Sequence, residues 1–263
     1  MIKKPKFIIL LYHKIGKYPQ NAKFPGLYVT EENFDEQIKY LKDAGYVFLT
    51  LSELKNIYDY YYNYKNEKTD SFNPKNFNPD NSIEKNKKYA AITFDDGSKS
   101  IYSSGLKVMR NNGVTATVFM VSGLTGRINE WDINNGENED AMLNVYELEE
   151  LMKYGVEIGA HTLTHPHLTG ISPEEAFTEI SNSKKDLEDL LGVKINFFAY
   201  PYGEHNEEVK SLVRKAGFYG ACITKTGIVK NGADFFALKR VAIRHNTDFF
   251  KFKRKILKVR LFY

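Results

Sequence analysis

The chain has 263 residues, of which 42% are hydrophobic and 14% aromatic, so it can build a large core and global disorder is excluded. Its net charge of +4, from 37 basic and 33 acidic residues, is too small to indicate a nucleic-acid-binding protein. A lone cysteine, Cys222, excludes an internal disulfide framework and a cysteine-based zinc site. Because α/β barrels of this length commonly form one domain, we expect a single domain across residues 1–263.

The first predicted element is the apolar run FIILLY, residues 7–12. This run is shorter than the apolar region of a secretory signal peptide, and no small-residue cleavage site follows it. No stretch of the chain approaches the roughly 18 consecutive apolar residues that indicate a membrane-spanning helix. We therefore interpret residues 7–12 as a buried first strand and expect a cytoplasmic protein, with peripheral membrane contact as an extension of that expectation.

A helical segment, a glycine and an apolar strand-like run follow one another five times along the chain. A glycine in this place supplies the left-handed conformation that often ends a helix. The five glycines are Gly45, Gly113, Gly155, Gly192 and Gly217. In SPEEAF, Ser172 can cap a further helix, Pro173 fits its first turn and Glu175 completes a capping box. Alternating helices and strands predict parallel α/β architecture, and about seven such units favour a (β/α) barrel over an open doubly wound sheet.

Residues 58–88 interrupt this alternation. They are rich in asparagine, lysine and tyrosine and show no sustained hydrophobic period. We interpret the part after about Tyr64 as a flexible surface insertion, with a tyrosine-lined substrate edge as the alternative.

Residues 247–263 predict a basic C-terminal helix that is capped by Thr247 and packs Phe249, Phe250 and Ile256 on the barrel. The helix also carries six cations from Lys251 to Arg260. A second interpretation is therefore a basic amphipathic surface that contacts an anionic membrane.

Polar residues stand directly after several predicted strands. Asp95 and Asp96 follow the apolar part of AITFDDGSKS, His13 follows FIILLY, and His161 follows VEIGA. All of these positions are C-terminal strand ends, the face on which barrel enzymes build their active sites. Two adjacent carboxylates repel one another when buried, and a nearby cation removes that cost. Because one aspartate with two histidines is a sound ligand set for a divalent metal, the sequence predicts a metal site on this face.

The histidines lie in EIGAHTLTHPHLTG, at positions 161, 165 and 167. The spacing of His161 and His165 matches the helical metalloprotease motif H-E-x-x-H, but Thr162 occupies the position of its glutamate and the preceding segment is a predicted strand. His165 and His167 match the H-x-H of barrel amidohydrolases, but that motif normally lies on the first strand. We expect His167 to be a loop residue beside the site.

Three motifs, in order, resemble those of the polysaccharide deacetylases of carbohydrate esterase family 4. TFDDG and HTLTH resemble its first two motifs, and FAYPYG resembles the third motif of the subgroup that contains poly-β-1,6-N-acetylglucosamine deacetylases. The segments LLYHKIG, ENFDEQIKYLKDAGYVFLTLSEL and LKRVAIRHNTDFFKFKRKI also resemble that subgroup. The resemblance therefore covers most of the chain outside residues 58–88.

This resemblance implies a distorted barrel with fewer than eight full βα units and a divalent metal bound by Asp96, His161 and His165. We expect this metal to be zinc, although the same ligands accept other divalent ions. The resemblance also implies that Asp95 is the general base for attack by a water on the acetyl group. Pro201 and Tyr202 lie in the third motif, so the resemblance places them at the substrate, with the Tyr202 backbone N–H stabilising the oxyanion.

The sequence departs from the commoner family pattern in two places. The late L-x-H motif that supplies the general acid is absent, and His13 in the subgroup's YH pair is its expected replacement, with His245 as the rival. The third motif lacks its usual arginine because position 199 is alanine. Arg240 is the candidate that would orient Asp95 in its place.

The sequence thus predicts a deacetylase that removes N-acetyl groups from an amino sugar of an acetylated glycan. One alternative is an esterase for polysaccharide O-acetyl groups, and another is a catalytically silent carbohydrate-binding relative. Trp131, in a polar run, is either a sugar-stacking platform or the anchor of its loop.

Overall fold

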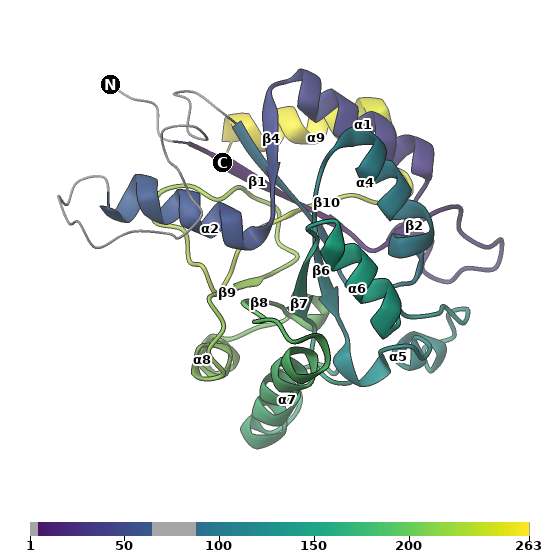
Figure 1. Ribbon diagram of the computed structural model, residues 1–263, viewed down its shortest axis with the longest axis vertical. Helices are drawn as coiled ribbons and strands as arrows, with labels where there is room; N and C mark the ends of the chain where they lie inside the picture. The colour runs from purple at the N-terminus through teal and green to yellow at the C-terminus, as the bar shows by residue number, and fades with distance from the viewer. Residues whose placement is uncertain (1–4, 65–87, 263) are drawn as a thin grey trace.

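The computed structural model describes residues 5–64 and 88–262, which form a curled parallel sheet flanked by helices (Figure 1). The strands of the large sheet are β1 (Phe7–Tyr12), β4 (Tyr46–Leu49), β5 (Lys88–Phe94), β6 (Thr117–Met120), β7 (Glu157–Ala160), β8 (Phe197–Ala199), β9 (Gly220–Cys222) and β10 (Val241–Ala242). β2 (Lys14–Ile15) and β3 (Tyr28–Val29) form a separate pair. The helices are α1 (Glu31–Asp43), α2 (Leu51–Asp59), α4 (Leu106–Asn112), α5 (Glu130–Ile133), α6 (Val145–Lys153), α7 (Pro173–Leu191), α8 (Glu207–Lys215) and α9 (Phe249–Phe262).

The strand β5 organises the sheet because it has neighbours along both edges. It pairs with β1 over its length, while its other edge pairs first with β4 and then with β6. The sheet continues through β6, β7, β8 and β9, and all of these pairings are parallel. Six of the seven residues of β5 are buried, as expected for a parallel strand covered on both faces.

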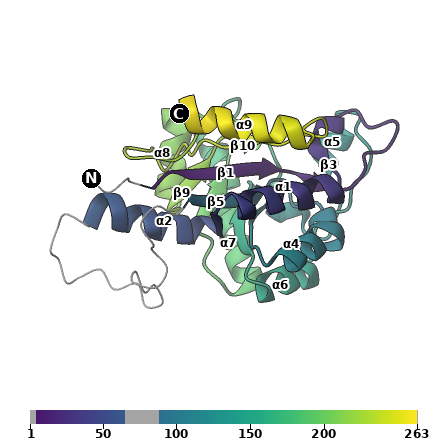
Figure 2. The same cartoon turned by 90° about the horizontal axis from the view of Figure 1, so that it is seen from above.

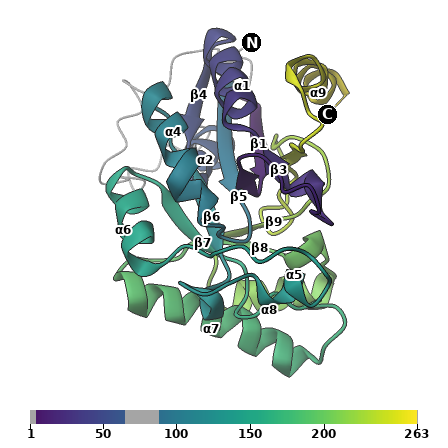
Figure 3. The ribbon, with the colours of Figure 1, turned by 90° about the vertical axis from the view of Figure 1, so that its right-hand side faces the viewer.

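The segment 238–242 brings the two ends of the curled sheet together. Leu238 bridges to Cys222 in β9, and Val241 pairs with Leu10 in β1. The helices lie outside the curled sheet (Figures 2 and 3). Within the described residues, β1, β4, β5, β6, β7, β8 and β10 are each followed by a helix, whereas β9 is followed by a loop. The prediction of a distorted (β/α) barrel with about seven units is confirmed.

The predicted helix ends are also confirmed. The glycines at positions 45, 113, 155, 192 and 217 all have positive φ angles, between 61° and 87°. At the start of α7, Ser172 and Glu175 form the expected reciprocal capping box, with Pro173 in the first turn. These local signals set where each helix stops and the chain turns back into the sheet.

The two described ends of the predicted insertion, residues 58–88, belong to regular elements. Residues up to Tyr64 continue α2 through a π-helical turn, and Lys88 already belongs to β5. Tyr58 is buried, with its ring 4.7 Å from that of Phe235. The surface excursion predicted after Tyr64 falls on residues 65–87, which lie outside the described residues.

The basic helix α9 forms, but two details of its prediction are wrong. Its cap is Asp248, whose Oδ1 accepts a hydrogen bond from the Lys251 backbone N–H at 2.8 Å, whereas the Thr247 hydroxyl accepts from the Arg244 backbone N–H. Phe250 does not pack on the barrel, as its 76% exposed surface shows. The structure buries Phe252 in its place, two positions further along the helix.

Candidate active site and metal centre

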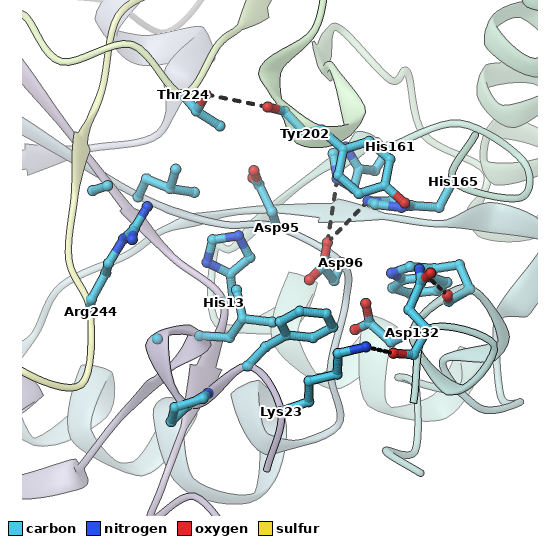
Figure 4. Close-up of a pocket in the computed structure, with 18 of the residues that line it drawn as sticks. His13, Lys23, Asp95, Asp96, Asp132, His161, His165, Tyr202, Thr224 and Arg244 are labelled. Atoms are coloured by element: carbon cyan, nitrogen blue, oxygen red, sulfur yellow. Dashed lines mark hydrogen bonds and ion pairs between the residues drawn. The ribbon is translucent and has the colours of Figure 1, made fainter. Parts of the chain in front are cut away.

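The residues predicted at the C-terminal strand ends line a single pocket (Figure 4). The ends of six strands contribute to it, namely β1, β5, β7, β8, β9 and β10, together with the loop between β2 and β3 and the segment around α5. The predicted site residues that line it are His13, Asp95, Asp96, His161, His165 and Tyr202. Each of them reaches the pocket because parallel strands present their C-terminal ends on one side of the sheet.

A tight turn after β5 directs the two adjacent carboxylates toward different partners. Asp96 and Gly97 both have positive φ angles, of 72° and 84°. A side chain at Gly97 would place its Cβ 2.2 Å from the Met120 sulfur, so this position requires glycine. Asp95 turns toward Arg240, and Asp96 turns toward His161 and His165. The pair is thus two separate functional groups and not one repelling cluster.

Asp95 forms a buried, two-point ion pair with Arg240. Its two carboxylate oxygens accept hydrogen bonds from Arg240 Nη1 and Nη2 at 2.7 and 2.6 Å. The fully buried guanidinium also donates to the Thr93 hydroxyl and to the Ile223 carbonyl, both at 3.1 Å. Burial alone would raise the pKa of Asp95, but the charge and hydrogen bonds of Arg240 hold it below its usual range. Asp95 is therefore ionised and fixed in orientation.

Asp96, His161 and His165 form a buried group whose donor atoms all lie within 4.8 Å of one another. Asp96 Oδ1 is 3.4 Å from His161 Nε2 and 3.6 Å from His165 Nε2. These separations exceed those of strong charge-assisted hydrogen bonds and are close to the roughly 3.3–3.5 Å between ligand atoms around a tetrahedral zinc ion. The donor set and its spacing fit a divalent metal.

Neighbouring groups fix the orientation of both imidazoles. His161 Nδ1 is hydrogen-bonded to the Ala199 carbonyl at 2.7 Å, which directs its Nε2 toward Asp96. The His165 ring stacks on the Trp131 indole at a centroid distance of 4.6 Å, and the edge of the Tyr202 ring contacts it at 4.7 Å. Trp131 is buried here, so of its two interpretations the structure favours the loop anchor over an open sugar platform.

The pKa values of the two histidines in this group shift in opposite directions. Burial lowers the pKa of His165 to about 3, helped by the charge of His161. Burial also disfavours the charged form of His161, but the interactions with Asp96 and Asp95 outweigh this effect and raise the pKa of His161. Burial would raise the pKa of Asp96, yet the surrounding imidazoles lower it. Asp96 is therefore a permanent anion between two nitrogens, as a metal ligand must be.

The two candidates for the general acid occupy different places. His13 lines the pocket, whereas His245 is exposed and packs against Tyr18 at a ring distance of 5.5 Å, outside the pocket lining. Burial lowers the pKa of His13, against the opposing charges of Asp96 and Asp95. Such an imidazole is a strong proton donor once it is protonated. The geometry favours His13 over His245.

The third motif forms a tight turn beside the group of Asp96, His161 and His165. Pro201 is buried at its start and lies outside the pocket lining, while Tyr202 has a φ angle of 59° and faces the pocket. A Cβ at Gly203 would lie 2.1 Å from the Thr224 hydroxyl, so the turn packs tightly against the segment that follows β9. His167 stacks on the Tyr202 ring at 3.9 Å and bonds to Glu204, which leaves it beside the pocket as expected.

Other pocket residues were missed by sequence reasoning. Lys23 and Phe24 come from the loop between β2 and β3, whereas Asp132 lies on α5 and Asn135 follows this helix. The Lys23 ammonium donates to the Asn135 carbonyl, which joins the two loops across more than a hundred residues of sequence. Burial, together with the charge of Asp96, raises the pKa of Asp132 to about 7. Only the adjacent Trp131 in EWD gave a sequence signal for this wall of the pocket.

Comparison with known proteins identifies the family. The polysaccharide deacetylase family model matches residues 82–221, just over half of the chain. The Bacillus subtilis (strain 168) protein YxkH is 27% identical over 241 residues, which are 92% of this chain and 72% of YxkH. A poly-β-1,6-N-acetyl-D-glucosamine N-deacetylase of Staphylococcus aureus (strain MRSA252) is 24% identical over 254 residues, 89% of this chain and 78% of that protein.

A solved structure shares the fold over nearly the whole chain. The Streptococcus pyogenes deacetylase PplD, in complex with acetate, superimposes with a TM-score of 0.73, at 24% identity and with 97% of both chains covered. This chain belongs to the polysaccharide deacetylase family, carbohydrate esterase family 4, and is a deacetylase.

Proposed function

We propose that this deacetylase is a metal-dependent hydrolase that removes N-acetyl groups from N-acetylglucosamine units of a polysaccharide or oligosaccharide and releases acetate. The observation that carries the proposal is the buried Asp96, His161 and His165 group, set directly beside the Asp95–Arg240 ion pair. The Staphylococcus aureus relative, which is named for N-deacetylation of such a polymer, supports the choice of substrate class.

Asp96, His161 and His165 would hold the metal, and zinc is the ion that best suits one carboxylate and two imidazoles. A divalent metal at this place supplies Lewis-acid polarisation of the acetyl carbonyl and of a water. The surrounding aromatic rings, Trp131 and Tyr202, hold the His165 ligand in place.

The remaining groups account for the proton transfers. Asp95 accepts a proton from the attacking water as the new C–O bond forms, using the carboxylate lone pairs that Arg240 leaves free. The Tyr202 backbone N–H donates to the developing oxyanion. His13 then gives a proton to the sugar nitrogen as the C–N bond breaks, which yields acetate and a free amine.

His13→Ala is expected to reduce kcat for N-deacetylation by about 10²–10⁴-fold, because an amine must be protonated as it leaves. Hydrolysis of an O-acetyl ester on the same enzyme should fall much less, since an alcohol leaves with less help. Acetate release from N-acetylglucosamine oligomers and from O-acetylated xylan measures both reactions.

His245→Ala is the matched control, because this exposed histidine lies outside the pocket lining, and it should leave both rates near the wild-type values. A larger loss in His245→Ala than in His13→Ala would reverse the assignment of the acid. Wild-type acetate release from the xylan alone would replace the proposed function with an O-acetyl esterase.

A further inference from the structure

The helix α9 has two apolar faces, and only one of them is covered. Phe252, Ile256 and Val259 are buried, with at most 2% of each side chain exposed. On this inner side, the Phe252 ring packs on the Tyr40 ring of α1 at 6.1 Å. One apolar stripe of this kind is what a surface helix needs in order to pack on its domain.

The opposite face of α9 exposes large apolar side chains. Phe250, Leu257 and Leu261 recur at a spacing that places them on one side of a helix, and Phe262 follows at its end. The exposed fractions are 76% for Phe250, 68% for Leu261, 76% for Phe262 and 54% for Leu257. The first three are the largest among the bulky hydrophobic residues that the structure describes. Several large apolar side chains exposed along one side of a helix indicate an interaction surface.

The charge on this outer face is positive. Within α9, six lysines and arginines occur and no aspartate or glutamate. Arg254 and Lys258 are exposed between the apolar side chains, and in the described part of the chain no carboxylate pairs with either of them. Together with Leu257, Leu261 and Phe262, they line a shallow groove along the helix. We call Phe250, Arg254, Leu257, Lys258, Leu261 and Phe262 the outer face of α9.

This combination fits the surface of an anionic bilayer. Apolar side chains that alternate with cations along a helix enter the boundary between headgroups and acyl chains, while the cations contact anionic headgroups. A second copy of this chain fits poorly, since like charges would meet across the interface. None of the helices in the described residues is long and apolar enough to cross a membrane, so the contact is peripheral.

The position of α9 links this surface to the active site. Ile243 and Arg244 line the active-site pocket, and Asn246 and Thr247, a few residues later, line the groove on α9. The helix therefore begins a few residues after the pocket lining, and it runs along the outside of the barrel beside α1 (Figures 2 and 3). A bilayer against the outer face would therefore lie beside the pocket.

We propose that α9 docks on anionic lipid bilayers through its outer face and holds the pocket beside the membrane surface. The docking is inferred from α9 alone. Its consequence is that the enzyme acts on glycan held at a membrane, and this consequence rests on the proposed function.

The test is co-sedimentation of the whole protein with phosphatidylcholine vesicles, with and without phosphatidylglycerol. Binding is expected only with the anionic lipid and should weaken as salt is added. Arg254→Gln with Lys258→Gln should weaken it about thirtyfold, given the contribution of each cation near an anionic surface. Phe250→Ser with Leu261→Ser should abolish binding, and because both side chains are exposed these changes leave the fold intact.

Tyr146→Ser is the matched control, because this exposed aromatic lies on α6, and it should leave vesicle binding unchanged. Acetate release from soluble oligomers should be the same in all these variants, so a failure of docking is distinguished from a failure of the proposed activity. No binding to anionic vesicles, binding that survives the α9 replacements, or self-association lost in those variants would each overturn the proposal.

Discussion

Asp95→Asn is expected to reduce kcat for acetate release by about 10²–10⁴-fold while zinc binding is retained. Asparagine cannot take a proton from the attacking water, yet the proposed metal ligands Asp96, His161 and His165 are untouched. The measurement is kcat on N-acetylglucosamine oligomers, made together with the zinc content of the purified variant and its thermal unfolding.

Asp132→Asn is the matched control, because Asp132 is a third buried carboxylate in the pocket, beside Asp95 and Asp96, and forms no ion pair with an arginine among the described residues. Its loss of activity should be far smaller than that of Asp95→Asn. A folded, zinc-bound Asp95→Asn enzyme with wild-type kcat would contradict the role of Asp95 as the base.

Arg240→Met is expected to destabilise the fold and to move the acid limb of the pH–rate profile to higher pH. Removing one partner of a buried ion pair costs about 3–5 kcal/mol of unfolding free energy. Without the guanidinium, burial raises the pKa of Asp95, so a larger fraction of Asp95 is protonated at a given pH. Activity should therefore begin at a higher pH than in the wild type, with about a tenfold loss for each unit by which the pKa exceeds the assay pH.

Arg240→Lys separates charge from geometry in the same experiment. Lysine keeps a cation near Asp95 but cannot reproduce the two-point contact, so its acid limb should fall between those of the wild type and Arg240→Met. Thermal unfolding and kcat/KM against pH give both readouts. If the folded Arg240→Met variant kept the wild-type acid limb, Arg240 would be a structural residue only.

The parts of the fold that follow local rules could be predicted from the sequence. Helix ends at Gly113 and Gly192 and the capping box at Ser172 depend on a few neighbouring residues, and the structure has them where the pattern indicated. The placement of the aspartates and histidines on one face followed from the parallel barrel, because strand ends meet on one side.

Non-local contacts set the limit of that prediction. Nothing in the sequence indicates that the loop bearing Lys23 meets the loop bearing Asn135, since their contact depends on how two distant loops cross the pocket. On α9, Phe250 and Phe252 are the same residue type two positions apart, and only the position of α1 decides which one is buried. The lone tryptophan in a polar run, Trp131, stands out in the sequence, but its stacking on His165 depends on the fold of its loop.

Zinc-dependent acetate release is the most direct test of the proposed metal-dependent deacetylation. Metal-stripped wild-type protein is assayed on N-acetylglucosamine oligomers with increasing zinc, beside His165→Ala and His167→Ala. These histidines share one loop, but only His165 belongs to the buried ligand group. We expect no acetate without zinc. Added zinc should restore acetate release in the wild type and in His167→Ala but not in His165→Ala. Full activity of the stripped enzyme, or equal loss in both variants, would contradict this proposal.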